Sequence, residues 1–535
     1  MIRKLFHNTT VLAGLIWRRD RMRIPVWILS IALVSISVAM SFPSLYPEGP
    51  ERFIIAETLK NPAMISMIGP GYGLGNYHIG AIMAHQMLLF TAMAVAMMNI
   101  MLTIRHTRRD EESGRIEVIR SLPVGRLSNA AATILVLAIT NISLGLVMSV
   151  GLGVLGLEGM DWAGSLLYGA VLTTVGIFFA ALTLLFSQLT ETSRAAQGYT
   201  FAFLGVAYLL RAIGDIGSET LSRLSPLGLI LRTQVYVQNY WWPIWVVLVL
   251  AGIIGCAALR LNATRDLQAG IIAARPGRRY ASRLLRSPLG LVWRLERTSI
   301  LSWAVGIFIL GASYGSVFRD IDSFFQTSDL YQKILPMIED FSLSEQFVAM
   351  LLSIMSMMAA IPALLILLKL GAEEKANRTE HLLARAVSRS GLLGSFLVIA
   401  MVVAVVMQVL SVLGLWTVAA LSIHGNPFPF FETLWAGMIY VPMMWILLGV
   451  ATALLGFFPK RTGMVWLYLT YSFFTIYLGN ILQLPEWMAK LTPWGHVPNV
   501  PIEPVMVSTV AMSLFLAIVL IGLGFYGYNK RDIRG

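Results

Sequence analysis

Long apolar stretches alternate with short charged stretches along the whole chain. A bilayer core about 30 Å thick needs roughly 20 mostly apolar helical residues per span. Because the bilayer core offers no water, a crossing segment must also satisfy its own backbone hydrogen bonds, which favours helices. The pattern predicts an all-α membrane protein with twelve transmembrane helices. The predicted spans are 24–43, 82–104, 129–154, 165–188, 197–214, 242–259, 299–317, 347–368, 392–420, 433–457, 463–482 and 505–527.

The composition agrees with this pattern. Of the 535 residues, 57% are hydrophobic and 13% are charged, whereas about a quarter of the residues of a soluble protein carry charge. Cys256 is the single cysteine, so an intrachain disulfide and a thiolate metal cluster are excluded. The composition therefore excludes an ordinary soluble enzyme.

The distribution of charge predicts an orientation. The chain has 40 Lys and Arg residues against 28 Asp and Glu residues, a net charge of +12. With both termini in the cytoplasm, the cytoplasmic segments hold 32 of the basic residues and 12 of the acidic residues. This bias follows the positive-inside rule. The net charge is therefore explained by membrane topology, and no nucleic-acid partner is expected.

The chain is predicted to be an internal repeat. Four pairs of segments match in order, at nearly one offset and at equivalent places relative to the spans. They are 15–27 with 291–303, 115–126 with 378–389, 224–228 with 491–495, and the Arg-Asp pairs at 265–266 and 531–532. We predict a first six-helix half over 1–260, a basic cytoplasmic linker over 261–290 and a second half over 291–535. Because six is an even number, the two halves run in the same direction.

Two kinds of helix are expected on the cytoplasmic side of each half. An amphipathic helix precedes the first span, where it lies in the membrane interface or only anchors the fold. The charged loop after the second span repeats an acidic pair and has helical spacing of apolar residues. It is interpreted as a short helix that docks to a two-fold partner. The alternative is a solvated loop whose charges only set topology.

These features together resemble the permeases of ABC type-2 exporters, most of all the fused twelve-span permeases that export tetronasin or polyketide antibiotics. The loop over 111–124 has the pattern E-E-x-G-x-x-E-x-x-x-x-x-P-V. The resemblance implies that this loop and its repeat couple the permease to two copies of a separate ATPase subunit. The implied coupling residues are Glu111, Glu112, Gly114, Glu117, Pro123, Val124, Glu373, Glu374, Arg378 and Glu380. The second loop departs from the pattern, with Asn377 or Ala376 near the glycine position and Ala386 at the proline position, so weaker or differently shaped coupling is expected there.

The energy source follows from what the sequence lacks. The chain contains no G-x-x-x-x-G-K-[ST] motif for nucleotide phosphates, so we expect no enzymatic activity and no cofactor in this chain, with ATP and Mg on the partner ATPase. Arg211 and Lys369 fall at the ends of the predicted spans, and other charges lie outside them. Ion-coupled carriers commonly need charged groups within spans. An ion-coupled multidrug carrier is therefore the alternative, followed by a membrane enzyme acting on lipid or a scaffold.

A hydrophobic or amphiphilic substrate is predicted from methionine and aromatic residues in spans two, five, eight and eleven, although such residues also serve as plain packing. Export from the cytoplasm through a bacterial cell membrane is implied by the resemblance. The candidate path residues are Met87, Phe90, Met97, Met350, Met357, Phe203, Tyr208, Tyr471 and Phe474. The isolated polar residues His85, Asn99 and Asn141 are expected to hydrogen-bond between helices or to touch a ligand. The seven histidines form no metal-binding motif, so no metal site is predicted.

Two further segments, 215–241 and 483–504, occupy equivalent positions outside the membrane before spans six and twelve. The second contains five prolines, which prevents a long regular helix. By the family resemblance, these segments are partly re-entrant helices that close the outer mouth. The alternative is a pair of ordinary interfacial loops.

Overall fold

The structure is a computed structural model in which every regular element of the described residues is a helix. The described residues are 5–49, 52, 56, 59–60, 62–267, 269–272, 279–316, 318, 343–385, 387–422, 429–477, 485–498 and 507–532. The fold class predicted from the hydrophobic pattern is confirmed.

Eleven helices of the described part of the chain are long and apolar enough to cross a membrane. The predicted span 463–482 corresponds to α23, which is described over Met464–Tyr477 and is shorter than a full span; its last predicted residues lie outside the described ranges. Twelve spans therefore stay a prediction. The eleven candidates are formed by α3 (Arg23–Leu45), α6 and α7 (Ile79–His106, Arg108–Glu112), α9 (Ser128–Val154), α10 (Trp162–Leu189), α11 (Ser193–Gly217), α14 (Trp242–Thr264), α15 (Pro288–Ser316), α18 (Leu343–Lys375), α20 (Arg389–Ser422), α21 and α22 (Phe430–Met438, Val441–Phe457) and α25 (Val507–Lys530).

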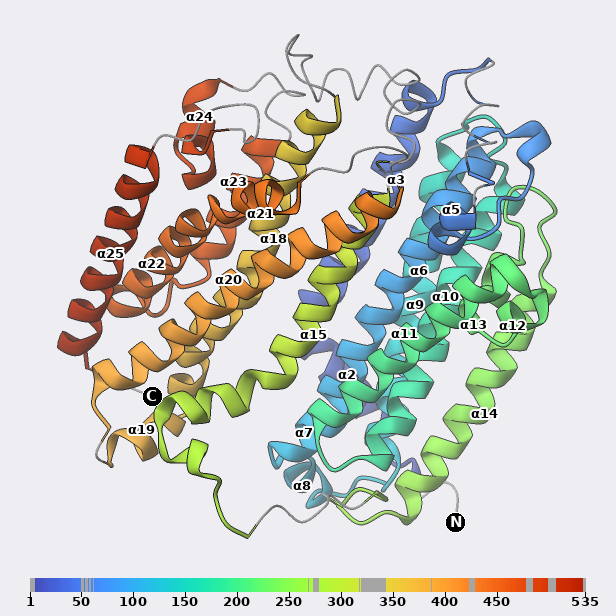
Figure 1. The fold of residues 1–535 in the computed structure, drawn as a ribbon. Helices are drawn as coiled ribbons and strands as arrows, with labels where there is room; N and C mark the ends of the chain where they lie inside the picture. Colours follow the sequence, from blue (N-terminus) through green and yellow to red (C-terminus); the bar gives the residue numbers. More distant parts are fainter. Residues whose placement is uncertain are drawn as a thin grey trace. The chain divides into compact units, whose positions relative to one another are not determined.

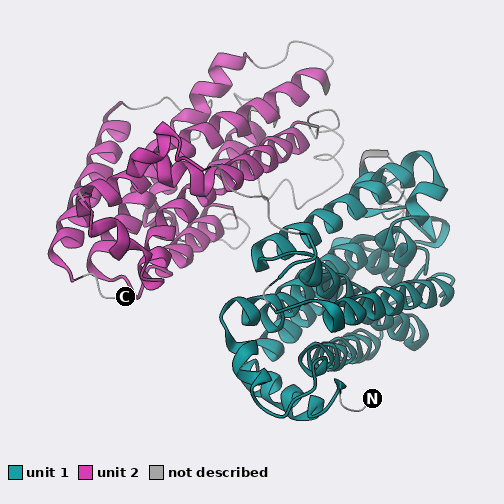
Figure 2. Ribbon diagram, turned by 90° about the horizontal axis from the view of Figure 1, so that it is seen from below, with its two compact units in different colours: residues 1–277 teal, residues 278–535 magenta. Residues whose placement is uncertain are grey.

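The chain divides into two compact units, residues 1–277 and 278–535, coloured teal and magenta in Figure 2. The division falls inside the stretch 261–290 that the charge pattern assigns to a linker. Short helices complete each unit. In unit 1 they are α2 (Thr9–Arg19), α5 (Pro62–Ile68), η1 (Leu74–Asn76), α8 (Arg115–Arg120), α12 (Glu219–Arg223) and α13 (Pro226–Leu231), and in unit 2 they are η2 (Arg283–Arg286), α19 (Arg378–Leu383), α24 (Glu486–Lys490) and η4 (Pro493–His496).

Helix α10 lies at the centre of unit 1, where it packs against α6, α9, α11 and α14. The crossing of α9 and α10 depends on small residues. A side-chain carbon at Gly169 would lie 2.2 Å from the Gly145 carbonyl oxygen, so the two backbones are in direct contact, as is common between membrane helices. Helices α7 and α8 lie at one end of this bundle and α5 lies towards the other (Figure 1).

Helices α18, α20 and α22 form the core of unit 2, with α15 against α20 and α25 against α22. Small residues again permit close crossings. A side-chain carbon at Gly456 would lie 2.5 Å from the Gly524 carbonyl oxygen. Helix α19 lies at one end of this unit and α24 at the other (Figure 1).

The amphipathic stretches before the first spans differ between the units. In unit 1 the stretch is a helix of its own, α2, separated from α3 by a turn over residues 20–22. In unit 2 it is the beginning of the continuous helix α15. Pro25 explains the break, because proline has no backbone N–H to donate to the carbonyl four residues earlier and its ring crowds that carbonyl. The position that matches Pro25 at the offset of 276 holds Leu301, which allows the helix to continue.

Helix α11 contains the predicted span 197–214 and is longer at both ends. Helix α11 continues to Gly217, so Arg211 and Asp215 both lie within a membrane-length helix, and Arg211 is not at its end. Their side chains form a buried ion pair at 3.2 Å. The pair makes the longer helix possible, because a buried charge requires a partner.

Candidate functional site

Eight of the ten predicted coupling residues lie on two short segments, which we call the coupling segments: residues 108–120 in unit 1 and residues 371–383 in unit 2. Pro123 and Val124 follow the first segment. In the first, α7 and α8 are joined by a turn at Gly114, which has φ of +73°. In the second, the end of α18 and α19 are joined by a turn at Asn377, which has φ of +56°. Asparagine is one of the few residues with a side chain that adopts this left-handed conformation readily. The missing glycine in the second loop therefore does not change the backbone turn.

Ion pairs brace both turns. Asp110 accepts a hydrogen bond from Arg115 at 3.1 Å, and Glu373 accepts one from Arg378 at 3.2 Å. Both arginines follow a turn by one residue and reach back across it. Each coupling segment is thus a helix–turn–helix held by a local charge pair.

The acidic residue next to each of these, Glu111 or Glu374, faces the interior of its unit. Glu111 is buried and accepts a hydrogen bond from Arg265 at 2.7 Å. Its carboxylate also lies 3.0 Å from the Arg108 guanidinium. Glu374 is buried and accepts from Arg531 at 2.6 Å and from the Tyr528 hydroxyl at 2.6 Å. These two predicted coupling residues therefore connect the coupling segments to the ends of α14 and α25 rather than presenting charge at the surface.

Three other predicted residues of the first loop make local contacts. Glu112 accepts hydrogen bonds from the backbone N–H and the hydroxyl of Ser193, both at 2.6 Å, and so satisfies the first turn of α11. The Pro123 carbonyl accepts from the Asn8 amide at 2.9 Å. Val124 packs against the apolar cluster between α2 and α9. The loop is therefore attached to the helices on both sides of it.

The exposed faces of the two coupling segments differ in chemistry. In unit 1, Glu117 is exposed beside two exposed apolar side chains, Val118 and Leu122. In unit 2, the exposed residues at matching positions are Glu380, His381 and Arg385. Burial lowers the pKa of Arg120 on the first segment, and the nearby positive charge of Arg126 lowers it further. One face is thus apolar with an acidic residue, and the other is charged.

Of the candidate path residues in unit 1, some line an open stripe of α6. Phe90 and Met97 are exposed and Met87 is half-buried. In α11, Phe203 is half-buried against Phe178 and Phe179, and the Tyr208 hydroxyl donates to the Met67 carbonyl at 3.0 Å. Met87, Phe203 and Tyr208 thus have packing or hydrogen-bond partners within the unit.

The candidates of unit 2 divide in the same way. Phe474 on α23 is exposed and Met350 on α18 is half-buried. Met357 is buried in the core of the unit. The Tyr471 hydroxyl donates to the Met488 carbonyl at 3.0 Å and so holds α24. In both units, therefore, a tyrosine of the fifth predicted span fastens a short segment outside the long helices.

The isolated polar residues within the spans of unit 1 have hydrogen-bond partners inside the unit. Asn99 and Asn141 exchange two amide hydrogen bonds, at 2.9 and 2.8 Å, across α6 and α9. His85 lies 2.8 Å from the Tyr77 hydroxyl and 3.1 Å from the Gly69 carbonyl. The expectation of hydrogen bonds between helices is correct for the asparagines, and these contacts use the polar atoms that a ligand would need.

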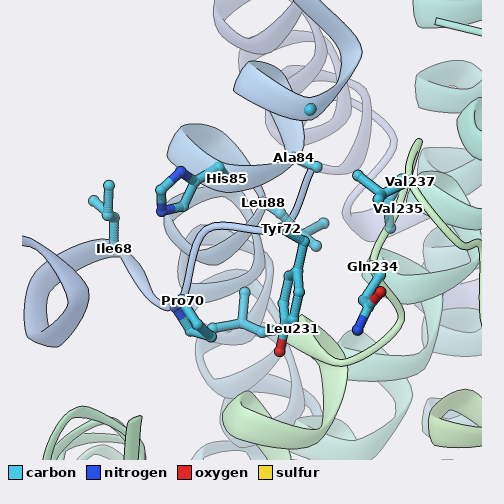
Figure 3. A pocket seen from close by; sticks show the side chains of 11 residues that line it. Ile68, Pro70, Tyr72, Ala84, His85, Leu88, Leu231, Gln234, Val235 and Val237 are labelled. Carbon is cyan, nitrogen blue, oxygen red and sulfur yellow. The ribbon is translucent and has the colours of Figure 1, made fainter. Parts of the chain in front are cut away.

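A small pocket lies beside His85, bounded by Tyr72 and by Gln234 after α13 (Figure 3). Its free volume is about 20 Å³, which is room for a single water molecule. A drug-sized ligand needs several hundred cubic ångströms. This pocket is therefore not a substrate site. Among the described residues, no cluster of His, Cys, Asp and Glu could hold a metal ion.

Comparison with known proteins identifies the family. A sequence profile described as "Multidrug efflux system permease Rv1217c, C-terminal domain" matches residues 11–261 and 285–529. The multidrug efflux system permease protein Rv1217c of Mycobacterium tuberculosis (strain ATCC 25618 / H37Rv) is 35% identical over 540 aligned positions, which cover 99% of this chain and 96% of the relative. The chain belongs to this family of multidrug efflux permeases. It is a membrane transport protein, as the many apolar helices also indicate.

One further feature of the permease, a contact between an acidic and a basic side chain that recurs in both units, was not predicted from the sequence pattern. Asp20, which ends α2, lies 2.6 Å from His106 at the end of α6. In unit 2, Glu296 forms an ion pair with Lys369. Glu296 matches Asp20 at the offset of 276, and Lys369 matches His106 at the offset of 263. Applying the repeat offsets to every charged residue, and not only to the motif residues, would have found this pair.

Proposed function

We propose that the permease is the transmembrane subunit of an ATP-driven ABC exporter that moves hydrophobic or amphiphilic drug-like compounds out of a bacterial cell. Two copies of a separate ATPase subunit would bind at the coupling segments, and ATP with Mg would bind to those subunits alone. The single observation that supports this most is the pair of braced helix–turn–helix segments, each with an exposed acidic residue, Glu117 or Glu380. The proposal includes the more specific assignment that the permease is of the type that exports tetronasin or polyketide antibiotics.

The proposal includes an internal repeat, with both termini and both coupling segments on the cytoplasmic face. Contacts that recur at the repeat offset support it. Arg126 donates to the Arg265 carbonyl at 2.8 Å, and Arg389, which is 263 positions later, donates to the Arg531 carbonyl at 2.8 Å. Ser225 and Thr492, at an offset of 267, both use their hydroxyl oxygens to cap a short helix. Equivalent halves would offer two related docking places to a two-fold ATPase.

Substitution at the exposed residues tests the docking. Full-length permease is co-purified in mild detergent with a candidate P-loop ATPase, which is sought in the reading frames next to that of the permease. In the variant with Glu117→Ala and Glu380→Ala, we expect the drug-stimulated rate of ATP hydrolysis to fall about tenfold, because interface residues that matter most act on this scale. Glu486→Ala on α24, which is exposed at the opposite end of unit 2, is the matched control. Unchanged stimulation in the double variant, or a wild-type permease that retains no ATPase, would count against the proposal.

One observation favours the alternative, an ion-coupled carrier. The buried pair Arg211–Asp215 lies inside α11, and ionisable groups within membrane helices often carry protons or ions. Here Arg211 also donates to the Ser66 carbonyl at 2.6 Å, and Asp215 accepts from Ser222 at 2.6 Å. These contacts favour a structural role in joining α5 and α12 to α11. Efflux that persists at constant ATP after collapse of the proton gradient would exclude the carrier.

A further inference from the structure

The ends of α14 and α25 are each connected to a coupling segment by an arginine that pairs with a buried glutamate. Arg265, the residue after α14, donates from its guanidinium to Glu111 and also to the Gln188 side chain of α10 at 3.1 Å. Arg531, the residue after α25, donates to Glu374 and lies over the Tyr528 ring at 4.8 Å. We define these two ion pairs, Glu111–Arg265 and Glu374–Arg531, as the strut pairs.

In each unit, the arginine of the strut pair makes a second contact, in which it accepts a hydrogen bond instead of donating one. The backbone carbonyl of the same arginine accepts a hydrogen bond from Arg126 in unit 1 or from Arg389 in unit 2. Arg126 follows α8, and Arg389 begins α20. The residue after α14 or α25 is thus held through its side chain by a glutamate of the coupling segment and through its main chain by an arginine that follows the segment.

The spans that the strut pairs hold have few other attachments. Few residues of α14 and α25 are buried, 22% and 17% of the apolar window of each helix, and each helix packs mainly against one long neighbour, α10 or α22. A helix supported along one side can tilt about that neighbour. The strut pair fixes its end to the coupling segment, so a displacement of the segment would be passed to the span.

Stability alone does not account for charged groups at these positions. Burying an ion pair costs desolvation that its attraction only offsets, and apolar residues of similar volume are often as stable. The two pairs also occur in different surroundings, with Arg108 beside Glu111 and Tyr528 beside Glu374. What they share is the connection between a coupling segment and the sixth predicted span of its unit.

We infer that Arg265 and Arg531 are positioning residues of the transport cycle, which transmit movement of the coupling segments to α14 and α25. This inference rests on the proposed function, since an ATPase must move the segments. Neither arginine is assigned to contact the ATPase or the substrate. Their loss should therefore separate ATP hydrolysis from transport while the ATPase stays bound.

The experiment uses the complete permease with its ATPase in proteoliposomes. The variants are Arg265→Gln and Arg265→Lys. The matched control is Arg223→Gln, which removes an exposed ion pair on α12. Retention of the ATPase, ATP-dependent efflux of ethidium and the thermal midpoint are measured for each. We expect Arg265→Gln to retain the ATPase but to lose about tenfold in efflux per ATP hydrolysed. Arg265→Lys, which keeps the charge, should recover part of the loss.

A direct measure of movement complements the efflux assay. Cys256 is the single cysteine of the chain and lies exposed on α14. A spin label there, with a second label at Leu146→Cys on the exposed side of α9, reports the distance between these helices. We expect this distance to change on ATP binding in the wild-type permease, and the change to be absent in Arg265→Gln. A merely structural arginine would alter the thermal midpoint without abolishing the ATP-dependent change.

A variant in unit 2 guards against misfolding. Glu374→Leu, Tyr528→Phe and Arg531→Met together replace the polar cluster by apolar side chains, which leaves no charge of the cluster unpaired. This variant should fold and bind the ATPase but show the same loss of efflux per ATP. Normal efflux per ATP in both Arg265→Gln and the triple variant would overturn the inference alone. A wild-type permease whose efflux does not respond to ATP would overturn the proposed function and the inference with it.

Discussion

Asn377 shows how a departure from a sequence pattern can leave the backbone unchanged. It has φ of +56°, close to the +73° of Gly114 at the equivalent turn. Glycine takes this conformation without steric cost, and asparagine takes it more easily than other residues with a side chain. The expectation of a differently shaped second loop therefore does not extend to its turn. The difference between the loops lies in their exposed side chains.

Substitutions at Gly114 test this account of the turns. Gly114→Asn should be tolerated, because Asn377 already occupies the same conformation in the other unit. Gly114→Ala should lower the free energy of unfolding by about 1–2 kcal/mol, the usual cost of a left-handed residue with a β-carbon. Thermal unfolding in detergent, with Gly217→Ala as a control at an open position outside the positive-φ region, measures both. Equal effects of asparagine and alanine would contradict the explanation.

Gly176 provides the space for the Asn99–Asn141 pair. A side-chain carbon at Gly176 would lie 1.9 Å from the Asn141 Oδ1 atom. We expect Gly176→Ala to destabilise the permease by about 1–3 kcal/mol, as overpacking of a core does. In a background of Asn99→Ala and Asn141→Ala, the same substitution should cost nearly nothing. An equal cost in both backgrounds, measured by unfolding, would show that the amide pair is not the reason for the glycine.

The family resemblance proposed two coupling loops but did not indicate which of their side chains are buried. The pattern placed Glu111 and Glu112 together as coupling residues, yet Glu111 faces inward to Arg265 while Glu112 caps α11. A difference of one residue turns a side chain by about 100° around a helix. Which of the two glutamate side chains faces the interior of the unit depends on the position of α14. No local sequence pattern specifies that position.

At the scale of elements, α2 has apolar residues on two faces. Leu12 is buried against α9, whereas Leu15 is 56% exposed. The second apolar face suits a helix lying in the membrane interface, where it would meet lipid. The sequence predicted an amphipathic helix here, but it did not show that one apolar face is needed to hold α2 to α9.

Truncation of these leucines separates the two faces of α2. Leu12→Ala should lower the free energy of unfolding by about 2–4 kcal/mol, because it leaves a cavity in a packed cluster. Leu15→Ala should change it by about 0.5 kcal/mol or less, since an exposed position loses little packing. Unfolding in detergent micelles tests both variants. A larger effect at Leu15 would mean that α2 packs through its other face.

The element boundaries show the same division between local and distant causes. Eleven of the twelve predicted spans coincide with a membrane-length helix, because each span has its own apolar run. The extension of α11 to Gly217 was missed because Asp215 is unfavourable in a span until it pairs with Arg211. The α15 helix is continuous because Leu301 replaces the proline of the first half. The first difference needed a tertiary contact, and the second was visible in the sequence.

At the scale of the whole molecule, charged contacts near the ends of the long helices recur in the two units. Asp20–His106 and Glu296–Lys369 connect the beginning of each unit to the end of its second span. The strut pairs connect the end of each sixth predicted span to the same region. Charged residues are thus concentrated where the long helices meet the coupling segments. This arrangement is suited to receiving a displacement from an attached subunit.

The proposed energy source is tested most directly in sealed proteoliposomes that contain the permease and its candidate P-loop ATPase. Ethidium movement is followed without any ion gradient, before and after addition of ATP and Mg, and again with a proton gradient in the absence of ATP. A catalytically inactive ATPase is the control. We predict ethidium movement with ATP alone and none with the proton gradient alone. Movement driven by the proton gradient without ATP would contradict the account.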